Sequence, residues 1–261
     1  MVQLHAPQFS TLKLYTPTDL HSLRHCDLPY LKEIAAWTKN FLAKPHPQLG
    51  RSGPVCPFLP RALKLEAIRL GVVRTKGLQL SDIEVLVRQY RDEFLVLEPC
   101  RGELAMYKAI MLIFPDLEAE ADACLVDQIQ QRLKPFFVEE GLMIGEFHQW
   151  NETPGLHNTH FRPLRSPIPM LAIRFMVESD LPFLDRITDD PQMRAHYLKA
   201  YLNRLGTDLE EQKRQQAQQA LVLAQQQIEE PYAYSKQELS KCPFARFSAT
   251  FSKLFTKVRA A

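Results

Sequence analysis

Residues Met106 to Phe114, with the sequence MYKAIMLIF, form a nearly continuous apolar run that ends at Pro115. A short run of this kind is typical of a buried strand, because a strand covered on its faces needs apolar side chains along its whole length. Proline ends such a strand because it has no amide hydrogen to donate to the sheet. The sequence therefore predicts a buried central strand, and the chain around it must supply the rest of a sheet.

The segments around this run alternate between strand and helix patterns. Ser81 is the expected N-cap of the first helix, and Gly141 is the expected end of the second. In chain order we expect a strand at 65–74, a helix at 81–94, the strand at 106–114, a helix at 118–140, and strands at 142–147 and 170–177. The order β-α-β-α-β-β predicts an α/β (α+β) fold in which helices pack on one sheet.

The chain outside this core is predicted to be helical or irregular. We expect three parts: residues 1–44 as an N-terminal lead-in with a helix, 45–186 as the α/β core, and 187–261 as a C-terminal helical extension. Residues 244–258 combine aromatic and basic side chains in the pattern of an amphipathic helix. This tail is predicted either to contact a membrane surface or a partner protein, or to dock on the core of its own chain.

Composition and charge exclude several classes of protein. The chain of 261 residues has 32 basic and 30 acidic residues, so its charge gives no reason to expect nucleic-acid binding. Its five cysteines form no CxxC pair, which argues against a disulfide framework or a structural zinc site. No apolar stretch reaches the roughly 20 residues of a membrane span, and no signal peptide is evident, so we expect a cytoplasmic protein. Phosphate loops, nucleophile elbows, HExxH and kinase motifs do not occur either.

Cys56 lies in a proline-rich segment, residues 44–60, within the sequence GPVCPF. The proline that follows Cys56 has a fixed φ angle and no amide hydrogen, which keeps the sulfur accessible. A cysteine thiolate of this kind can ligate haem iron and favour oxygen activation. The alternative is an ordinary loop cysteine. A second Cys-Pro-Phe sequence occurs at Cys242.

The segment between the last two predicted strands is long and rich in side chains that carry chemistry. Such loops are commonly functional. It contains His148, His157 and His160 together with Glu152, Arg162 and Arg165. The arginines can grip a carboxylate, a phosphate or haem propionates, and two of the histidines lie at a spacing that suits metal, although no third and fourth ligand is evident. The alternative is that the arginines tie the loop to the strand ends and the histidines lie on the surface.

Glu146 is an acid within the predicted strand at 142–147. A buried acid is costly unless it is paired or faces a cavity. Glu146 is therefore a candidate partner for a cationic substrate or for a loop arginine.

Two segments, VCPF at 55–58 and FRPLRSPIPMLAIR at 161–174, make the chain resemble an uncharacterised bacterial domain family over residues 45–205. More distantly the chain is similar to the YqcI/YcgG family, which has a Pro-Cys-x-Phe segment before its first strand. Some members of that family are haem proteins that N-hydroxylate guanidino groups, with this cysteine as the proximal thiolate. The resemblance implies haem b as cofactor and Cys56 as its iron ligand.

These observations predict a haem-thiolate oxygenase that acts on a small polar amine or guanidine and receives electrons from an external donor. Cys56 is the expected iron ligand. Glu146, His148 and His157 are expected to orient the substrate or deliver protons, and Arg162 and Arg165 to bind propionates or a substrate carboxylate.

Two alternatives stay open at this point. The chain could be a non-catalytic regulatory protein that binds haem or another ligand and contacts partners through its C-terminal helix. It could also be a cofactor-free enzyme or scaffold whose loop binds an anionic metabolite.

Overall fold

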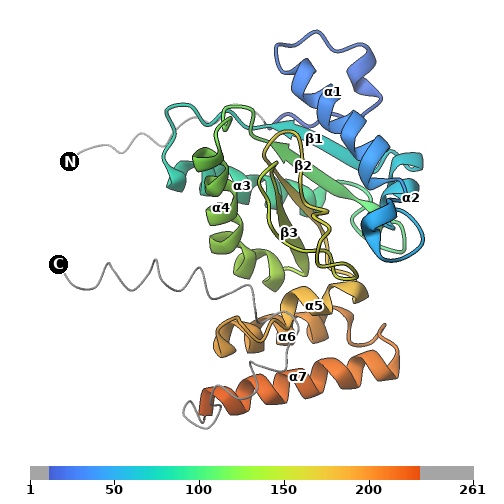
Figure 1. Ribbon diagram of the computed structural model, residues 1–261, viewed down its shortest axis with the longest axis vertical. Coiled ribbons are helices and arrows are strands. Elements are labelled where there is room, and N and C mark those ends of the chain that lie inside the picture. Colours follow the sequence, from blue (N-terminus) through green and yellow to red (C-terminus); the bar gives the residue numbers. More distant parts are fainter. Residues whose placement is uncertain (1–11, 230–261) are drawn as a thin grey trace, which may run out of the picture. The chain divides into compact units, whose positions relative to one another are not determined.

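The computed structural model describes residues 12–229. Four strands form one mixed sheet: β1 (Ile68–Val72), β2 (Ala109–Ile113), β3 (Leu142–Phe147) and β4 (Met170–Phe175). The strands lie in the order β1-β2-β4-β3, with β1 parallel to β2 and with β4 antiparallel to both of its neighbours (Figure 1). The prediction of an α/β fold is confirmed, and the apolar run at 106–114 supplies one of the two inner strands.

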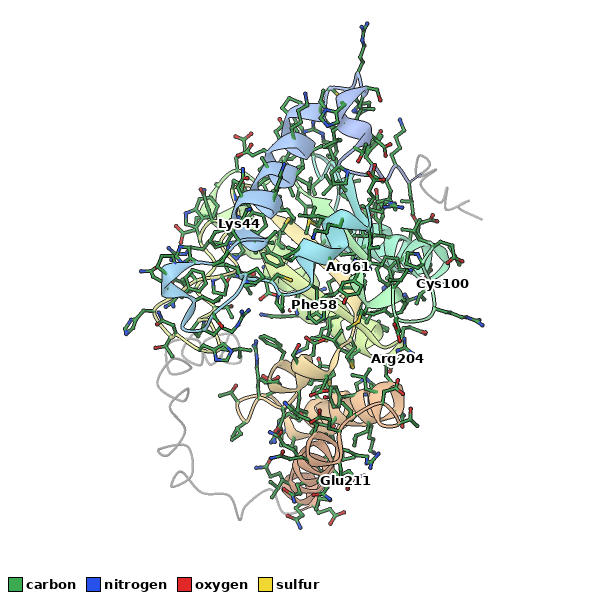
Figure 2. All side chains as sticks on the ribbon, turned by 90° about the vertical axis from the view of Figure 1, so that its right-hand side faces the viewer. Lys44, Phe58, Arg61, Cys100, Arg204 and Glu211 are labelled. Carbon is green, nitrogen blue, oxygen red and sulfur yellow. The ribbon has the colours of Figure 1, made fainter. Side chains whose placement is uncertain are left out.

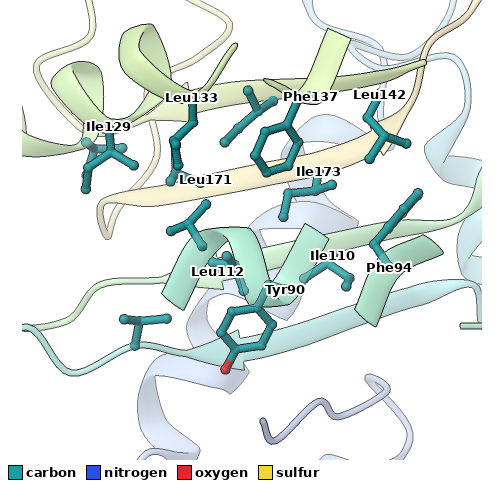
Figure 3. Close-up of a cluster of buried hydrophobic side chains, with 14 of the residues drawn as sticks. Tyr90, Phe94, Ile110, Leu112, Ile129, Leu133, Phe137, Leu142, Leu171 and Ile173 are labelled. Atoms are coloured by element: carbon teal, nitrogen blue, oxygen red, sulfur yellow. The ribbon is translucent and has the colours of Figure 1, made fainter. Parts of the chain in front are cut away.

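Helices α3 (Leu80–Val96) and α4 (Glu120–Glu139) cover one face of the sheet. Alternate residues of the strands, such as Ile110 and Leu112 on β2, point toward these helices and are fully buried (Figure 3). The helices pack on them with buried apolar residues at three- and four-residue spacing: Ile83, Val87, Tyr90 and Phe94 on α3, and Val126, Ile129, Leu133 and Phe137 on α4.

The N-terminal part of the chain covers the other face. Helix α1 (Leu28–Trp37), the π-helical turn at Thr38–Leu42 and the short helix α2 (Leu59–Lys64) pack on this side. Met111 and Ile113, the alternate residues of β2, belong to this second core. The segment before α1 also protects the edge of the sheet, because Tyr15 exchanges two backbone hydrogen bonds with Leu70 of β1.

A second compact unit begins at Val177. It contains α5 (Leu181–Leu184), α6 (Pro191–Leu205) and α7 (Glu211–Glu229). Alanines at 217, 220 and 224 form the buried stripe of α7. Within this unit the buried Arg194 donates hydrogen bonds to Asp185 and Gln227. The division after Met176 comes before the boundary expected at residue 186.

Several element bounds differ from the sequence prediction. Gln79, not Ser81, is the N-cap of α3, and its amide donates a hydrogen bond to Asp82. Helix α2 occupies the end of the segment expected to be irregular, since Pro60 is tolerated in a first helical turn. Within the described residues, no helix has both the length and the apolar character that crossing a membrane requires. Cys242 and the tail at 244–258 lie outside the described range.

Candidate functional site

The segment between β3 and β4, residues 148–169, is held together by its own contacts. His148 receives a backbone hydrogen bond onto its carbonyl from Asn151, and its amide bonds the carbonyl of Leu164. Gly155 and Phe161 are joined by a further backbone bond of 2.9 Å. Buried polar side chains lie at the base of this segment, at His148, Asn151 and Ser166. The long loop is therefore an ordered structure with a polar interior.

His148 is the buried polar residue of this interior whose hydrogen bonding is incomplete among the described residues. Its side chain is 6% exposed, and its Nε2 lies 3.1 Å from the Oδ1 of Asp127 on α4. The other ring nitrogen, Nδ1, is buried and has no hydrogen-bond partner among the described residues. When Asp127 accepts the Nε2 hydrogen, a neutral imidazole has its lone pair on Nδ1. A buried acceptor without a donor is costly, so Nδ1 calls for a partner that residues 12–229 do not supply.

The two other buried polar side chains at this base have partners. The Oδ1 of Asn151 accepts a 2.9 Å hydrogen bond from the amide of Thr153, and the hydroxyl of Ser166 donates to the carbonyl of Ile168 at 2.7 Å. These bonds shape the loop locally. His148 differs from these two residues because its Nδ1 can still form a hydrogen bond.

The two loop arginines converge on one acid. Arg162 donates to Glu152 at 3.0 Å and to the carbonyl of Thr159 at 2.6 Å. Arg165 also donates to Glu152, and its Nε bonds the carbonyl of Asn151 at 3.1 Å. Hydrogen bonds from Arg162 first, and then from Arg165, hold the pKa of Glu152 below its ordinary value. Much of the donor capacity of both arginines is thus used inside the loop.

The proline-rich segment lies against this loop. His46 stacks on Phe161 with ring centroids 4.6 Å apart, and the side chain of Asn158 donates to the carbonyl of Gln48 at 2.8 Å. Gly50 has a φ of +79°, and a Cβ placed there would lie 2.7 Å from the carbonyl oxygen of His157. Only glycine combines this φ with so close a backbone approach. Two segments about a hundred residues apart in sequence therefore form one surface.

Cys56 lies in this proline-rich segment with a free thiol and intermediate exposure. Its amide donates to the carbonyl of Leu42 at 2.8 Å, which fixes the backbone beside α2. The residue packs against the core on the α1 and α2 side of the sheet. The neighbouring Phe58 and Arg61, at the start of α2, are labelled in Figure 2.

The structure brings some of the predicted residues together and separates others. Glu146 shares its strand face with Leu142 and Ile144, which pack toward α4, and His148 bonds Asp127 on that same helix. Cys56 belongs to the opposite face. His157 is exposed and contacts the proline-rich segment through its backbone. Glu146 and His148 therefore share the α4 side, away from the sulfur.

Sequence reasoning missed Asp127, the partner of His148. Asp127 lies on α4 beside the buried Val126, and nothing in the sequence distinguishes it from the other acids of that helix. The pair joins residues that are 21 positions apart on two different elements. Only the packing of α4 on β3 brings them into contact.

A separate group of metal-type ligands is formed by His25, Cys26 and Asp27. Its carboxylate is already neutralised, because Arg74 forms ion pairs with Asp27 and, at 2.8 Å, with Asp116. The hydrogen bond to Asp116 raises the pKa of Arg74 further. A guanidinium in contact with a metal ligand opposes a bound cation, so this group is better explained as part of an ion-pair network.

A family model described as a domain of unknown function (DUF6875) matches residues 31–216. This match agrees with the expected likeness to an uncharacterised domain family, and it spans both the proline-rich segment and the loop at 148–169. The expected likeness to the YqcI/YcgG family gains no support from it. No curated protein and no solved structure matches the chain.

Proposed function

The chain belongs to the DUF6875 family, and we propose that its loop at 148–169 binds a small polar molecule with which His148 exchanges a proton. One observation carries this proposal: within residues 12–229 the buried Nδ1 of His148 has no hydrogen-bond partner, while Nε2 is held by Asp127. A ligand with an N–H or O–H group would supply the missing donor.

The proposed chemistry follows from the roles of the two ring nitrogens. A carboxylate at Nε2 fixes both the orientation and the tautomer of the ring, and it stabilises the imidazolium that forms when Nδ1 takes up a proton. His148 would then serve as general base toward a hydroxyl or amine, and as general acid in the return step. Glu146, on the same side of the sheet, would assist with a cationic substrate.

The tautomer can be tested directly with ¹⁵N-labelled histidine. We expect the NMR spectrum of His148 to show a protonated Nε2 and a lone pair on Nδ1 in the neutral ring, and we expect Asp127→Asn to weaken that preference. His160, which is exposed in the same loop, provides an internal control. A proton on Nδ1 in the neutral wild-type ring would overturn the proposal.

Binding can be tested by the melting temperature of the protein in the presence of small amines, guanidines, alcohols and carboxylates. Ligands that bind the folded state raise this temperature. We expect compounds that stabilise the wild type and His160→Gln to have no effect on His148→Gln. If a compound stabilises all three proteins equally, it binds elsewhere, and if none stabilises the wild type, the proposal fails for these classes.

A second candidate function is haem-thiolate oxygenation, for which we propose Cys56 as the iron ligand, with haem b and an external electron donor. The observation that favours it is a free, half-buried thiol that packs on an apolar cluster. Bound haem would supply oxygen activation, and apolar surroundings of a thiolate suit that chemistry. In this case Arg162 and Arg165 would need to exchange part of their bonds to Glu152 for the propionates.

The visible spectrum decides this second candidate. Purified protein is mixed with haemin, and the ferrous–CO spectrum is recorded for wild type, Cys56→Ala and the exposed control Cys124→Ala. A thiolate-type Soret band that Cys56→Ala alone removes would support the candidate. If the wild type takes up no haem, or if both variants behave like it, Cys56 is not an iron ligand.

A further inference from the structure

A small pocket lies at the end of the sheet opposite to the loop at 148–169. It has a volume of about 300 Å³ and is formed by the turn before β1 and the loop that follows α3. Its charged residues are Glu66, Arg69 and Glu98. A volume of this order is at the lower limit of pockets that hold small molecules.

Glu66 has an unusual backbone conformation at the rim of this pocket. Its φ is +50°, the one positive value among the non-glycine residues described. The residue follows the C-terminus of α2, at the position where helices commonly place glycine, and the amide of Ala67 reaches back to the carbonyl of Ala62 at 2.9 Å. A positive φ costs conformational free energy for glutamate but not for glycine, and strain of this kind concentrates at functional sites. Its carboxylate is held by the hydroxyl of Thr18 at 2.6 Å.

Arg69 supplies a positive charge with unused donors. Its Nη1 donates to the carbonyls of Glu66 and Ile68, which fixes the plane of the guanidinium. Its Nε and Nη2 donate to no group within residues 12–229. A guanidinium oriented in this way is suited to a carboxylate, which it can bind through two parallel hydrogen bonds.

Glu98 supplies a negative charge from the loop after α3. Its two oxygens accept from the amide of Cys100 at 3.1 Å and from the thiol of Cys100 at 3.3 Å; Cys100 is labelled in Figure 2. The backbone hydrogen bond from Cys100 is the main cause that lowers the pKa of Glu98, so the carboxylate stays ionised. Each oxygen retains a lone pair for a further donor.

The geometry points to a site for a small zwitterion, a molecule whose carboxylate and ammonium group are attached to the same carbon, with a short apolar side chain. Arg69 binds the carboxylate, and Glu66 and Glu98 bind the ammonium. The remaining walls are apolar, formed by Leu65, Ala67, Pro99 and Leu104. A free α-amino acid such as leucine has this combination of charges and side chain. The site is separate from that of the proposed function.

Leucine and two fragments of it test the site in an NMR titration of the full chain. Isocaproate is leucine without its ammonium group, and isoamylamine is leucine without its carboxylate. We expect leucine to shift the amides of residues 65–69 and 98–104, and we expect each fragment to bind at least about tenfold more weakly, since each loses a charge-assisted bond. Equal binding of either fragment, or no shifts with about 20 mM leucine, would overturn the proposal.

Glu66→Gly separates binding from folding. Glycine adopts a positive φ without cost, so this variant should unfold at the same or a higher temperature than the wild type. Its affinity for leucine should nevertheless fall about tenfold, as should that of Glu98→Gln, whereas the exposed control Glu103→Gln should bind like the wild type. If Glu66→Gly is more stable and also keeps full affinity, Glu66 is only a helix end and the assignment is wrong.

Discussion

His148 and Lys108 are both basic side chains buried at an end of the same sheet, yet they differ in how fully their nitrogens are hydrogen-bonded. Lys108 is 1% exposed, and its ammonium donates to the carbonyls of Phe94 and Leu97 at 2.6 and 2.5 Å. It also lies over the rings of Phe94 and Phe175, at 4.3 and 5.1 Å from their centroids. Among the described residues, the ring of His148 bonds Asp127 through Nε2 and has no partner at Nδ1. The lysine therefore has hydrogen-bond acceptors for its ammonium, whereas the histidine has a ring nitrogen that can still accept a hydrogen bond from a ligand.

Substitution of each residue by glutamine would test this contrast most strongly. Lys108→Gln leaves two carbonyls at the C-terminus of α3 without the ammonium and places an amide between aromatic rings, so we expect a loss of about 3 kcal/mol in unfolding free energy. His148→Gln still provides a donor for Asp127 and should cost less than about 1 kcal/mol. Urea unfolding measures both, with the exposed Lys64→Gln as control. Equal losses would contradict the contrast.

The pH dependence of stability gives a second test at Lys108. Burial, as the main cause, lowers the pKa of Lys108 from 10.5 to about 8. Between these values the unfolded chain binds more protons than the folded chain, so stability should rise with pH. The expected gain is roughly 2 kcal/mol between about pH 8 and pH 10.

The comparison protein for this measurement is Lys108→Gln, which lacks the titrating group. Its unfolding free energy should not share the rise of the wild type over the same interval. The interval stops near pH 10 because burial raises the pKa of Tyr90 to about 12, which acts in the opposite direction above that point. Parallel curves for the two proteins would mean that Lys108 is not responsible.

The sequence predicted the parts of the fold that depend on local pattern. The strand at 142–147 was predicted with its observed bounds, because Gly141 ends α4 in a left-handed conformation just before it. The strand expected at 65–74 is shorter, since Leu65 is the C-cap of α2 and Glu66 forms the turn that follows it. The end of α2, the turn and the start of β1 follow one another within one largely apolar segment. The spacing of apolar residues alone does not show where one element ends and the next begins.

The candidate site was predictable only in part. The length and composition of the loop at 148–169 marked it, but the Asp127 partner of His148 depends on how α4 packs against β3. Lys108 was hidden for a different reason. It stands inside the apolar run that predicts a strand, and its partners are backbone carbonyls of α3 and of the residue after it, which no side-chain pattern reveals.

Gly50 tests whether the loop end of the sheet depends on close backbone packing. Gly50→Ala would place a methyl group 2.7 Å from the carbonyl oxygen of His157 at a φ of +79°. Gly53 has a similar φ of +88°, but its Cβ would meet only the side chain of Arg51 at 3.6 Å. Gly53→Ala therefore measures the backbone cost alone, and Gly50→Ala should cost about 1–2 kcal/mol more. Hydrogen exchange at Gly155 and Phe161 should also quicken in Gly50→Ala only, and equal behaviour of both variants would mean that the two segments are not packed together.

The smallest effect is expected at Glu152, whose side chain is 67% exposed although it joins both loop arginines. Exposed ion pairs contribute little, so Glu152→Gln should reduce the unfolding free energy by less than about 1 kcal/mol at neutral pH. The pKa of Glu152 is lowered from 4.5, mainly by the hydrogen bond from Arg162, so this contribution is present above that value and is lost as pH falls through the folded-state pKa.

Unfolding curves of the wild type and of Glu152→Gln at neutral and acidic pH measure that difference, and Glu118→Gln on an exposed acid is the matched control. The wild type and Glu152→Gln should converge at low pH, while Glu118→Gln should follow the wild type throughout. A loss at Glu152 as large as that at Lys108 would show that the loop depends on its ion pairs for stability. Arg162 and Arg165 would then be structural residues, which would count against their proposed role as ligands of haem propionates.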